Sequence, residues 1–296
     1  MDKSFKSGYV GIVGVPNVGK STLLNKLAGQ KIAIISSKPQ TTRNKILAIA
    51  TDDDSQMVFL DTPGFHKPKT KLGESMIKSV NETISDVDLL LLVVEPDETV
   101  SAAEQMILDK IGDIPAILVI NKLDTEEKLN LLPVIEKYNG IHKFEDIIPV
   151  SASTGDGVEQ LREIIKKYLP EGPMYYPDDM VTDQSEKQIV AEIIREKALR
   201  LLNQEVPHGI AVEIIKMKNE GDNMCKISAN IYCEKESHKR IIIGAKGSKL
   251  KAIGTQARSD CEKMLDRQVF LQLWVKVKDD WRNSEQLMRE FGMSDL

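Results

Sequence analysis

Up to about residue 170, the hydrophobic positions of the chain gather in short runs separated by loops and helix-like stretches. The clearest runs are YVGIVG at 9–14, MVFLD at 57–61, DLLLLVVE at 88–95, PAILVIN at 115–121 and DIIPVSA at 146–152. Strands that are apolar throughout, without polar alternation, are buried on both faces, as in a parallel sheet covered by helices. The pattern therefore predicts an α/β fold with helices on both faces of the sheet.

The order of elements changes after residue 183. The stretch EGPMYYPDDMVTD at 171–183 contains two prolines and no hydrophobic periodicity, which is typical of a linker. Beyond it the pattern predicts a helix over 185–203, strands over 209–217 and 224–234, helices over 237–243 and 248–265, and a strand over 268–278. We therefore expect a first domain over residues 1–172, a linker over 173–183 and a smaller α+β domain over 184–296.

Composition limits the class of protein. The chain has 296 residues, 41% of them hydrophobic, which is enough to fill the cores of two folded domains. The net charge of -5 argues against a protein that is basic throughout, although a local basic patch remains possible. The longest apolar run, 89–94, is far too short to span a bilayer, and the N-terminus lacks the apolar stretch of a signal peptide. We expect no transmembrane segment.

The cysteines and histidines suggest no metal site. Cys225, Cys233 and Cys261 are odd in number and form no C-x-x-C pair, so they fit neither a disulfide framework nor a tetrahedral zinc site. Buried, reduced thiols in a cytoplasmic protein are the simpler interpretation. The histidines, His66, His142, His208 and His238, are scattered without metal-ligand spacing, and no chemistry is assigned to them.

The sequence GVPNVGKS, residues 14–21, matches G-x-x-x-x-G-K-[ST] in the context that this motif requires, with a strand before it and a helix after it. The backbone N–H groups of such a loop can surround a phosphate, and the helix N-terminus adds partial positive charge. Lys20 can reach the β- and γ-phosphates, and Ser21 can ligate Mg²⁺. A plain tight turn is the alternative, which the flanking strand and helix disfavour.

The sequence NKLD, residues 121–124, indicates which base is bound. It follows an expected strand, at the carboxyl edge where doubly wound sheets bind ligands. The Asp124 carboxylate can accept hydrogen bonds from guanine N1–H and from the 2-amino group, and adenine offers neither donor. Asn121 would tie this loop to the phosphate loop, the Lys122 stem would lie along the base, and the Ala152 N–H of SAS (151–153) can reach guanine O6. Taken alone, NKLD could also be a surface turn.

Two further stretches suit a switch that senses the γ-phosphate. In DTPG, residues 61–64, Asp61 can hold the magnesium shell through water, and the Gly64 N–H can contact the γ-phosphate. Thr42, in PQTTR at 39–43, can add a hydroxyl to Mg²⁺ when the γ-phosphate is present. Loss of that phosphate would release both loops. PQTTR alone is equally consistent with an ordinary polar loop.

Together these stretches resemble the five motifs of translation-factor-type GTPases over residues 9–170. The resemblance implies catalysis by positioning and charge neutralisation, with catalytic roles for Asn17, Lys20, Thr42 and Gly64. It implies Mg²⁺ contacts from Ser21, Thr42 and, through water, Asp61. The expected GTP contacts are Gly14, Val15, Pro16, Asn17, Val18, Gly19, Lys20, Ser21, Thr22, Asp61, Thr62, Pro63, Gly64, Phe65, Asn121, Lys122, Leu123, Asp124, Ser151 and Ala152.

The sequence departs from the GTPase pattern at one position. Ras-like members place a water-orienting glutamine directly after the D-x-x-G glycine, whereas this chain has Phe65, which cannot polarise water. Asn17 resembles the asparagine of relatives that use K⁺ in place of an arginine finger. We hypothesise slow, potassium-stimulated hydrolysis, with Asn17 as a K⁺ ligand. Arg43 as an internal arginine finger is less favoured than Arg43 as a solvated side chain.

The second domain contains IIIGAKGSKLKAIG, in which G-x-x-G at 244–247 lies between two expected helices. With the order helix, strand, strand, helix, helix, strand, it resembles a type II KH domain, which implies a cleft for about four single-stranded nucleotides. Six lysines and arginines and no acidic residue lie between 238 and 258. The expected RNA contacts are Lys239, Arg240, Ile243, Gly244, Ala245, Lys246, Gly247, Lys249, Lys251 and Arg258. The alternatives are a solvated basic helix beside a turn and, for Trp281, core packing rather than base stacking.

A single GTPase domain followed by a KH domain resembles the Era family, the bacterial GTPases of small ribosomal subunit assembly. The resemblance implies hydrolysis of GTP to GDP, binding to the 3′ end of the small-subunit ribosomal RNA and to the small ribosomal subunit, and control of that binding by the nucleotide. It further implies a cytoplasmic protein with peripheral association with the membrane, and we expect a monomer. Two alternatives stay open: a second domain that contacts proteins, and a tRNA-modification-type GTPase, whose folate-binding or cysteine-bearing domain has no candidate here.

Overall fold

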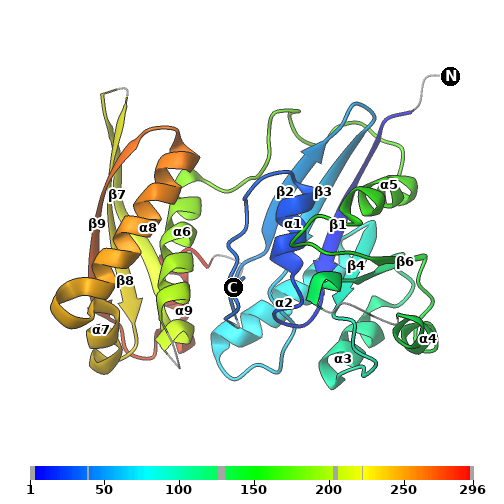
Figure 1. The fold of residues 1–296 in the computed structure, drawn as a ribbon, viewed down its shortest axis with the longest axis horizontal. Helices are drawn as coiled ribbons and strands as arrows, with labels where there is room; N and C mark the ends of the chain where they lie inside the picture. The colour runs from blue at the N-terminus through cyan, green and yellow to red at the C-terminus, as the bar shows by residue number, and fades with distance from the viewer. Residues whose placement is uncertain (1–3, 39, 126–130, 203–205, 222, 294–296) are drawn as a thin grey trace. The chain divides into compact units, whose positions relative to one another are not determined.

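The structure is a computed structural model that describes residues 4–38, 40–125, 131–202, 206–221 and 223–293 (Figure 1). By packing, the chain divides into two units. The first consists of Met1–Ala33, Thr42–Lys69 and Gly73–Asp183, and the second of Ile34–Thr41, Thr70–Leu72 and Gln184–Leu296. Each unit is described by itself.

The first unit is built on a six-stranded sheet in the order β2-β3-β1-β4-β5-β6. Its strands are β1 (Lys6–Val13), β2 (Ile46–Thr51), β3 (Ser55–Asp61), β4 (Leu89–Val94), β5 (Ala116–Ile120) and β6 (Asp146–Pro149). All neighbours run parallel except β2, which pairs antiparallel with β3. The sheet is mixed at this edge, because β2, which was not among the predicted strands, forms a hairpin with β3 across the short polar turn DDDS.

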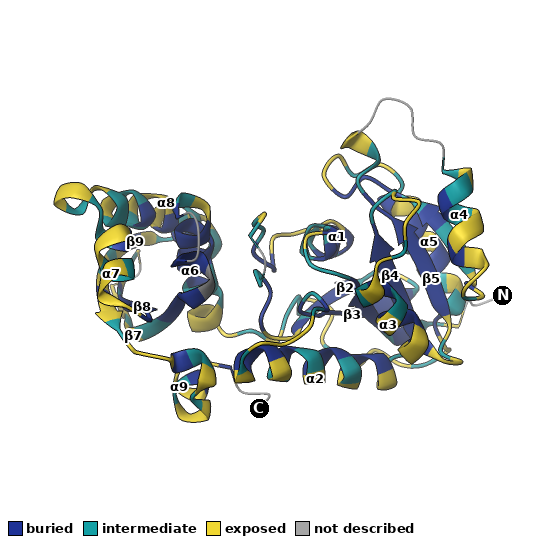
Figure 2. Ribbon diagram, turned by 90° about the horizontal axis from the view of Figure 1, so that it is seen from below, coloured by how far each residue is buried: buried dark blue, intermediate teal, exposed yellow. Residues whose placement is uncertain are grey.

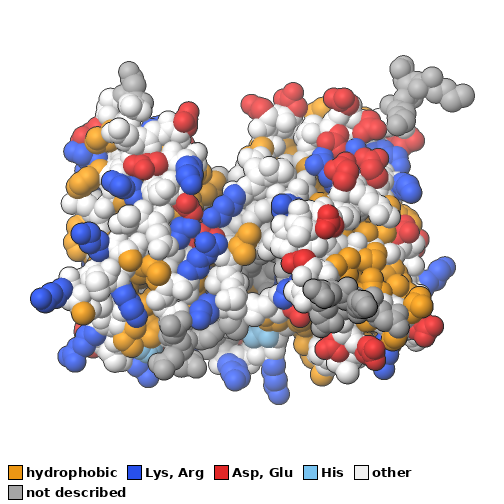
Figure 3. Space-filling view, in the orientation of Figure 1, with side chains coloured by type: hydrophobic (Ala, Val, Ile, Leu, Met, Phe, Trp, Pro, Cys, Tyr) orange, Lys and Arg blue, Asp and Glu red, His pale blue; other side chains and the backbone are white. Residues whose placement is uncertain are grey.

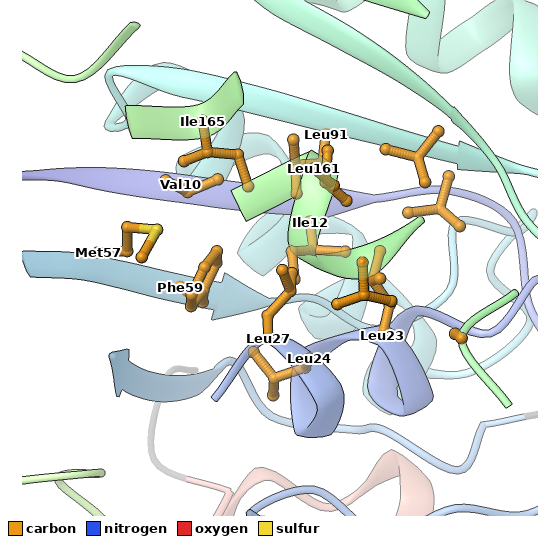
Figure 4. Packing of buried hydrophobic residues seen from close by; sticks show 14 of the residues in the cluster. Val10, Ile12, Leu23, Leu24, Leu27, Met57, Phe59, Leu91, Leu161 and Ile165 are labelled. Carbon is orange, nitrogen blue, oxygen red and sulfur yellow. The ribbon is translucent and has the colours of Figure 1, made fainter. Parts of the chain in front are cut away.

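Helices cover both faces of this sheet, as the sequence predicted. They are α1 (Lys20–Leu27), α2 (Lys71–Ser85), α3 (Ala102–Ile111), α4 (Leu132–Asn139) and α5 (Val158–Tyr168). Leu24 of α1 and Leu161 of α5 pack with Ile12 and Leu91 in one hydrophobic cluster (Figure 4). Side chains of α2, α3 and α4 form a second cluster with the other side of the strands.

Strand β4 shows why its sequence is apolar without alternation. Leu89, Leu91 and Val93 belong to the cluster with α1 and α5, whereas Leu90, Leu92 and Val94 belong to the cluster with α2, α3 and α4. Every residue of β4 and β5 is buried, and Figure 2 shows both strands in dark blue. The phosphate loop follows β1, so it stands on a strand that is fixed from both faces.

Residues 173–183, expected as a linker, lie along the first unit. The buried Gln56 side chain of β3 accepts the N–H groups of Tyr175 and Tyr176 and donates to the Tyr176 carbonyl. The Ile49 N–H of β2 donates to the Val181 carbonyl at 2.9 Å. This stretch satisfies polar groups at the β2 side of the sheet.

The second unit is a three-stranded sheet with its three longest helices on one face. Its elements are α6 (Glu186–Leu201), β7 (Ala211–Glu220), β8 (Met224–Cys233), α7 (Glu236–Ile243), α8 (Ser248–Leu265), β9 (Gln268–Val277) and α9 (Glu285–Glu290). β8 is central, antiparallel to β7 and parallel to β9. Val190 and Ile194 of α6, Ala257 of α8, and Ile227 and Ile231 of β8 share its core. The predicted α+β unit is confirmed, and α9 is an element that the sequence pattern did not reveal.

Helix α6 also buries charge. Ser185 caps its first turn in a capping box with Gln188, which fixes where the helix starts. Lys197, on the buried side, pairs with Glu196 at 2.8 Å and with Asp260 of α8. Buried charges are tolerated when they are paired in this way. This helix therefore buries charged side chains as well as apolar ones such as Val190 and Ile194.

The same helix holds the segment Ile34–Thr41 within the second unit. Glu196 Oε1 accepts the Ile35 N–H at 3.1 Å, and the Arg200 guanidinium donates to the Ile35 carbonyl at 3.2 Å. The Arg195 guanidinium donates to the carbonyl of Thr41. The residues that lead into Thr42 are thus fixed at both ends by charged side chains.

Trp281 is fully buried, and its indole N–H donates to the Gly209 carbonyl at 2.9 Å. It therefore packs in the core rather than stacking on a base. Cys225, Cys233 and Cys261 are also buried and are not in disulfides. Over the described ranges, none of the helices is long and apolar enough to cross a bilayer.

Replacing Trp281 by alanine should lower the free energy of unfolding of the second unit by about 3–5 kcal/mol, the usual cost of removing a large buried aromatic side chain. Trp274 is a matched control, because it is 47% exposed and its replacement by alanine should cost less than about 1 kcal/mol. Urea denaturation followed through amide exchange in β8 measures both. Equal losses for the two variants would contradict the assignment of Trp281 to the core.

Candidate functional site

The loop between β1 and α1 is shaped by close backbone approaches. At Gly19 the backbone has φ 98°, and a Cβ there would lie 2.2 Å from the Asn121 side-chain nitrogen. At Gly64, of DTPG, a Cβ would lie 2.7 Å from the Cα of Pro16. Both positions therefore require glycine. The loop ends at the N-terminus of α1, where free N–H groups favour a bound phosphate.

Lys20 lies buried beside this loop, and its Nζ donates to the carbonyls of Gly14 at 3.0 Å and Val15 at 2.9 Å. Burial lowers the pKa of Lys20 to about 8, and the negative charge of Asp61 opposes that shift. A cation held here by two carbonyls is available to charged phosphate oxygens, which are stronger acceptors.

Three oxygen-bearing side chains converge next to Lys20. Ser21 Oγ donates to Asp61 Oδ2 at 2.6 Å and lies 2.8 Å from Thr42 Oγ1. Burial raises the pKa of Asp61 to about 6, although Lys20 and the hydroxyls of Ser21 and Thr42 favour its ionised form. Its other oxygen, Oδ1, is buried and has no hydrogen-bond partner among the described residues. Two hydroxyls and an under-satisfied carboxylate are hard oxygen donors that fit Mg²⁺.

Asn121 ties the base-reading loop to the phosphate loop, as expected. It is buried, and its amide nitrogen donates to the Val18 carbonyl at 2.7 Å. Its amide oxygen accepts the Ala152 N–H at 2.9 Å. In this structure the Ala152 N–H, expected to reach guanine O6, is therefore bonded to Asn121.

The carboxylate of Asp124 is held by two hydroxyls, Ser151 Oγ and Ser153 Oγ, each at 2.6 Å. These two hydrogen bonds lower the pKa of Asp124, so the carboxylate is ionised and acts only as an acceptor near neutral pH. Lys122 pairs with Glu95 at 2.5 Å. Ser153 and Glu95 were not among the predicted site residues. Ser153 was signalled by the SAS motif, whereas nothing in the sequence indicated Glu95.

Phe65 occupies the position of the missing glutamine, and its side chain packs in the hydrophobic core. Its N–H donates to the Gly14 carbonyl at 3.1 Å, while its side chain is buried in the cluster with Val13 and Val80. Asn17 is exposed in the loop with φ 69°, a conformation that asparagine tolerates better than most residues. Arg43 is 6% exposed, so the expectation of a solvated side chain was wrong.

In the second unit, the GxxG turn joins α7 to α8. Gly247 has φ 78°, and a Cβ there would meet nothing within 4 Å, which leaves space for another backbone to approach. At Gly244 a Cβ would lie 3.0 Å from the backbone nitrogen of Lys249. The turn therefore keeps one glycine for internal packing and presents the other to solvent.

A groove of about 480 Å³ extends from this turn between α8 and β9, and we call it the GxxG groove. It is lined by Gly247, Leu250, Lys251, Gly254, Thr255, Arg258, Leu271 and Leu273. Among the predicted basic contacts, Arg240, Lys246, Lys251 and Arg258 are exposed, and Lys239 and Lys249 are half-buried. In Figure 3, Lys and Arg side chains are more numerous than acidic ones over α7 and α8. The leucines of β9 were not predicted, although the strand alternation would have placed them on one face.

The two units match two family models. Residues 9–122 match the model described as 50S ribosome-binding GTPase, and residues 205–282 match the KH domain. The GTPase Era of Clostridium kluyveri is 53% identical over 289 residues, which cover 97% of this chain and 99% of that protein. The GTPase Era of Clostridium botulinum is 51% identical over 294 residues, which cover 99% of both.

Two solved structures are similar over nearly the whole chain. One is Era in complex with MgGDPNP and nucleotides 1506–1542 of 16S ribosomal RNA, with a TM-score of 0.94 and 42% identity over 97% of this chain and 99% of that one. The other is a variant of Aquifex aeolicus Era bound to GDP·AlF4⁻, with a TM-score of 0.93, 42% identity and the same coverage.

Two glycines test the phosphate loop. Gly19→Ala should lower GTP affinity by on the order of 10²-fold, because the new methyl group displaces Asn121 and the loop that it holds. Gly29 is a matched control with φ 71° and nothing within 4 Å of a Cβ. Gly29→Ala should cost about 1 kcal/mol of stability and leave GTP affinity unchanged. Titration with a fluorescent GTP analogue measures both, and similar affinities for the two variants would refute the close approach.

Proposed function

The chain belongs to the Era family of GTPases, and on that premise we propose that it uses GTP binding and hydrolysis to control the capture of single-stranded RNA at the 3′ end of the small-subunit ribosomal RNA. The observation that carries the proposal is the GxxG groove, where exposed basic side chains border a floor of leucines. Such a groove suits a single strand, since bases need apolar support and phosphates need positive charge. The Era structure with 16S ribosomal RNA supports this choice of RNA. A role in small-subunit assembly follows from the same premise.

For the nucleotide, we propose the contacts predicted from the five motifs. The loop 14–19 and Lys20 surround the phosphates, and Asp124 binds guanine. Asn121 joins the loop that carries Asp124 to the phosphate loop. Support comes from the ionised Asp124, which is aimed by Ser151 and Ser153, and from the amide bridge of Asn121 to Val18. A carboxylate left unpaired against adenine is the basis of base selection.

For the metal, we propose Mg²⁺ held by Ser21 and Thr42, with Asp61 acting through water. Support comes from the converging oxygens of these three side chains and the buried, unpartnered Asp61 Oδ1. When bound, Mg²⁺ neutralises charge on the β- and γ-phosphates. The chain's own contribution is to hold the phosphates with Lys20 and the loop amides.

For catalysis, we propose that Asn17, rather than residue 65, assists GTP hydrolysis by ligating K⁺ through its side-chain oxygen. Phe65 has no polar side-chain atom, and its ring is buried in a hydrophobic cluster. Asn17 is exposed in the loop itself. A monovalent cation there would offset charge that develops on the phosphates during transfer.

For the RNA, we propose contacts from Lys239, Arg240, Ile243, Gly244, Ala245, Lys246, Gly247, Lys249, Lys251 and Arg258, together with Leu250, Leu271 and Leu273. The cytoplasmic location, the peripheral association with the membrane, the monomeric state and the boundaries 1–172, 173–183 and 184–296 remain predictions. They rest on the family resemblance and the sequence pattern alone. The second unit as a protein-contact module remains the alternative function.

RNA binding tests the main proposal. The full chain, loaded with a non-hydrolysable GTP analogue, should bind a labelled single strand of the rRNA 3′ end, with affinity that falls as KCl rises. Lys251→Gln should weaken binding about 5-fold and reduce the slope of log K against log salt by about 0.7. Lys187→Gln, an exposed lysine on α6, is the matched control and should change neither. No RNA binding by a chain that still binds GTP would favour the protein-contact alternative.

Potassium dependence tests the role of Asn17. Phosphate release from GTP should be about 10-fold faster or more in KCl than in NaCl of equal ionic strength, which corresponds to about 1.4 kcal/mol. Asn17→Gly tolerates the positive φ and removes the oxygen, so the difference between the salts should vanish. Asn17→Asp keeps an oxygen ligand and should retain it. Equal rates in both salts for the unmodified chain would refute the idea.

A further inference from the structure

The sheet of the second unit has a second face, opposite the helices, and most of it is uncovered. Strand alternation turns Cys225, Ile227, Ala229 and their partners on β9 toward the helices. It turns the other half of the residues away from them. We call this surface the open face and define it by Lys216, Lys218, Lys226, Ser228, Phe270, Gln272 and Trp274.

Two aromatic rings stand on the open face in contact with solvent. Phe270 is 50% exposed and Trp274 is 47% exposed. They lie four residues apart on β9, about 13 Å along the strand, so each ring is available to a different partner group. At the far end of this face Phe291 stacks on Tyr232 with ring centroids 4.5 Å apart, which closes that end. The two exposed rings lie outside that cover.

The open face is also positively charged. The register places Lys218 beside Lys226 and Lys226 beside Phe270, in one row across the three strands. Its acidic neighbours are engaged, because Glu220 pairs with Lys226 at 2.7 Å and Glu213 accepts the Tyr232 hydroxyl. Lys216 and Lys218 form no ion pair with any residue that the structure describes.

The GxxG groove leads to this face. A second groove shares Arg258 with it and is also lined by Arg267 and Phe270. Asp266 is an exposed acid at its rim, and Glu262, also in this groove, accepts the Val269 N–H and lies 4.0 Å from Arg258. The two grooves thus have Arg258 in common, and the second brings Arg258 and Arg267 together with the aromatic ring of Phe270.

We propose that the open face is a second stacking surface for the same single-stranded RNA, with Phe270 and Trp274 each supporting a base beyond those held in the GxxG groove. The inference rests on the proposed function. A KH cleft holds about four nucleotides, so a longer strand must find further support or remain in solvent. Exposed aromatics among lysines suit RNA better than protein, since protein interfaces are depleted in lysine while single-strand platforms combine stacking with positive charge.

The chain has two tryptophans, and this makes the proposal directly measurable. Trp274 is half-exposed and Trp281 is fully buried, so a change in tryptophan emission on RNA binding reports on Trp274. The full chain, loaded with a GTP analogue, is titrated with two single strands of the rRNA 3′ end. One has about 6 nucleotides and fills only the groove, and the other has about 16. The long RNA should quench the emission and the short RNA should not.

Affinity provides the second measurement. Phe270→Ala and Trp274→Ala should each weaken binding of the long RNA by about 5-fold or more, and should leave the short RNA unaffected. Phe270→Tyr and Trp274→Phe keep a ring and should retain the affinity. Met106→Ala, which removes a 52% exposed apolar side chain from α3, is the control and should change neither RNA.

Three results would overturn the proposal. Long-RNA affinity that survives both alanine substitutions, with unchanged emission, would show that no base stacks there. Equal losses for short and long RNA would show that the rings only support the groove. Loss of binding to small ribosomal subunits with both RNA affinities intact would assign the face to a protein partner. Failure of the unmodified chain to bind either RNA would instead refute the proposed function, and this inference with it.

Discussion

The nucleotide site depends on backbones approaching more closely than any side chain would allow. At Gly19 the phosphate loop lies against the Asn121 amide, and at Gly64 the DTPG turn lies against Pro16. These two contacts join three loops that follow three different strands, β1, β3 and β5. Because all three strands contribute buried residues to the packed core, the loops cannot separate without disturbing it. The position of Lys20, the oxygens around Asp61 and the aim of Asp124 all follow from this constraint.

Much of this site could be predicted because its chemistry depends on short, contiguous stretches. Gly14–Ser21, Asp61–Gly64 and Asn121–Asp124 each carry their residues at fixed spacing, next to strands whose apolar runs are unmistakable. What the sequence could not reveal depends on contacts between distant residues. Glu95 reaches Lys122 only because β4 and β5 are neighbours in the sheet. Leu271 and Leu273 line the GxxG groove only because α8 folds back onto β9. Strand β2 is as long as β4 and was missed because its role depends on the hairpin that it forms with β3, whereas α9 was missed because it has only six residues.

The buried charged side chains of α6 hold the segment that leads into Thr42. Desolvated ion pairs add little net stability. They nevertheless fix geometry, because breaking one leaves an unpaired charge buried in the core, which is strongly destabilising. Arg195 and Glu196 use such buried positions to hold Thr41 and Ile35. The next residue along the chain, Thr42, contacts Ser21 in the cluster of oxygens around Asp61. The proposed control of RNA capture by the nucleotide requires a segment that both ligands influence, and the residues 34–42 meet that requirement through chain continuity alone. Any coupling through them must be reciprocal, so RNA would shift nucleotide affinity as much as nucleotide shifts RNA affinity.

The distribution of charge explains how an acidic chain can still be an RNA binder. A net charge of -5 opposes indiscriminate attachment to the abundant nucleic acid of a cell, because phosphate is also negatively charged. Six basic side chains and no acidic one lie between residues 238 and 258, beside the leucines of the GxxG groove. A duplex keeps its bases stacked inside. Its phosphates could contact the basic side chains, but its bases could not pack on these leucines. Selection of single strands therefore needs no base-specific hydrogen bond. It follows from placing the positive charge where apolar surface is also exposed.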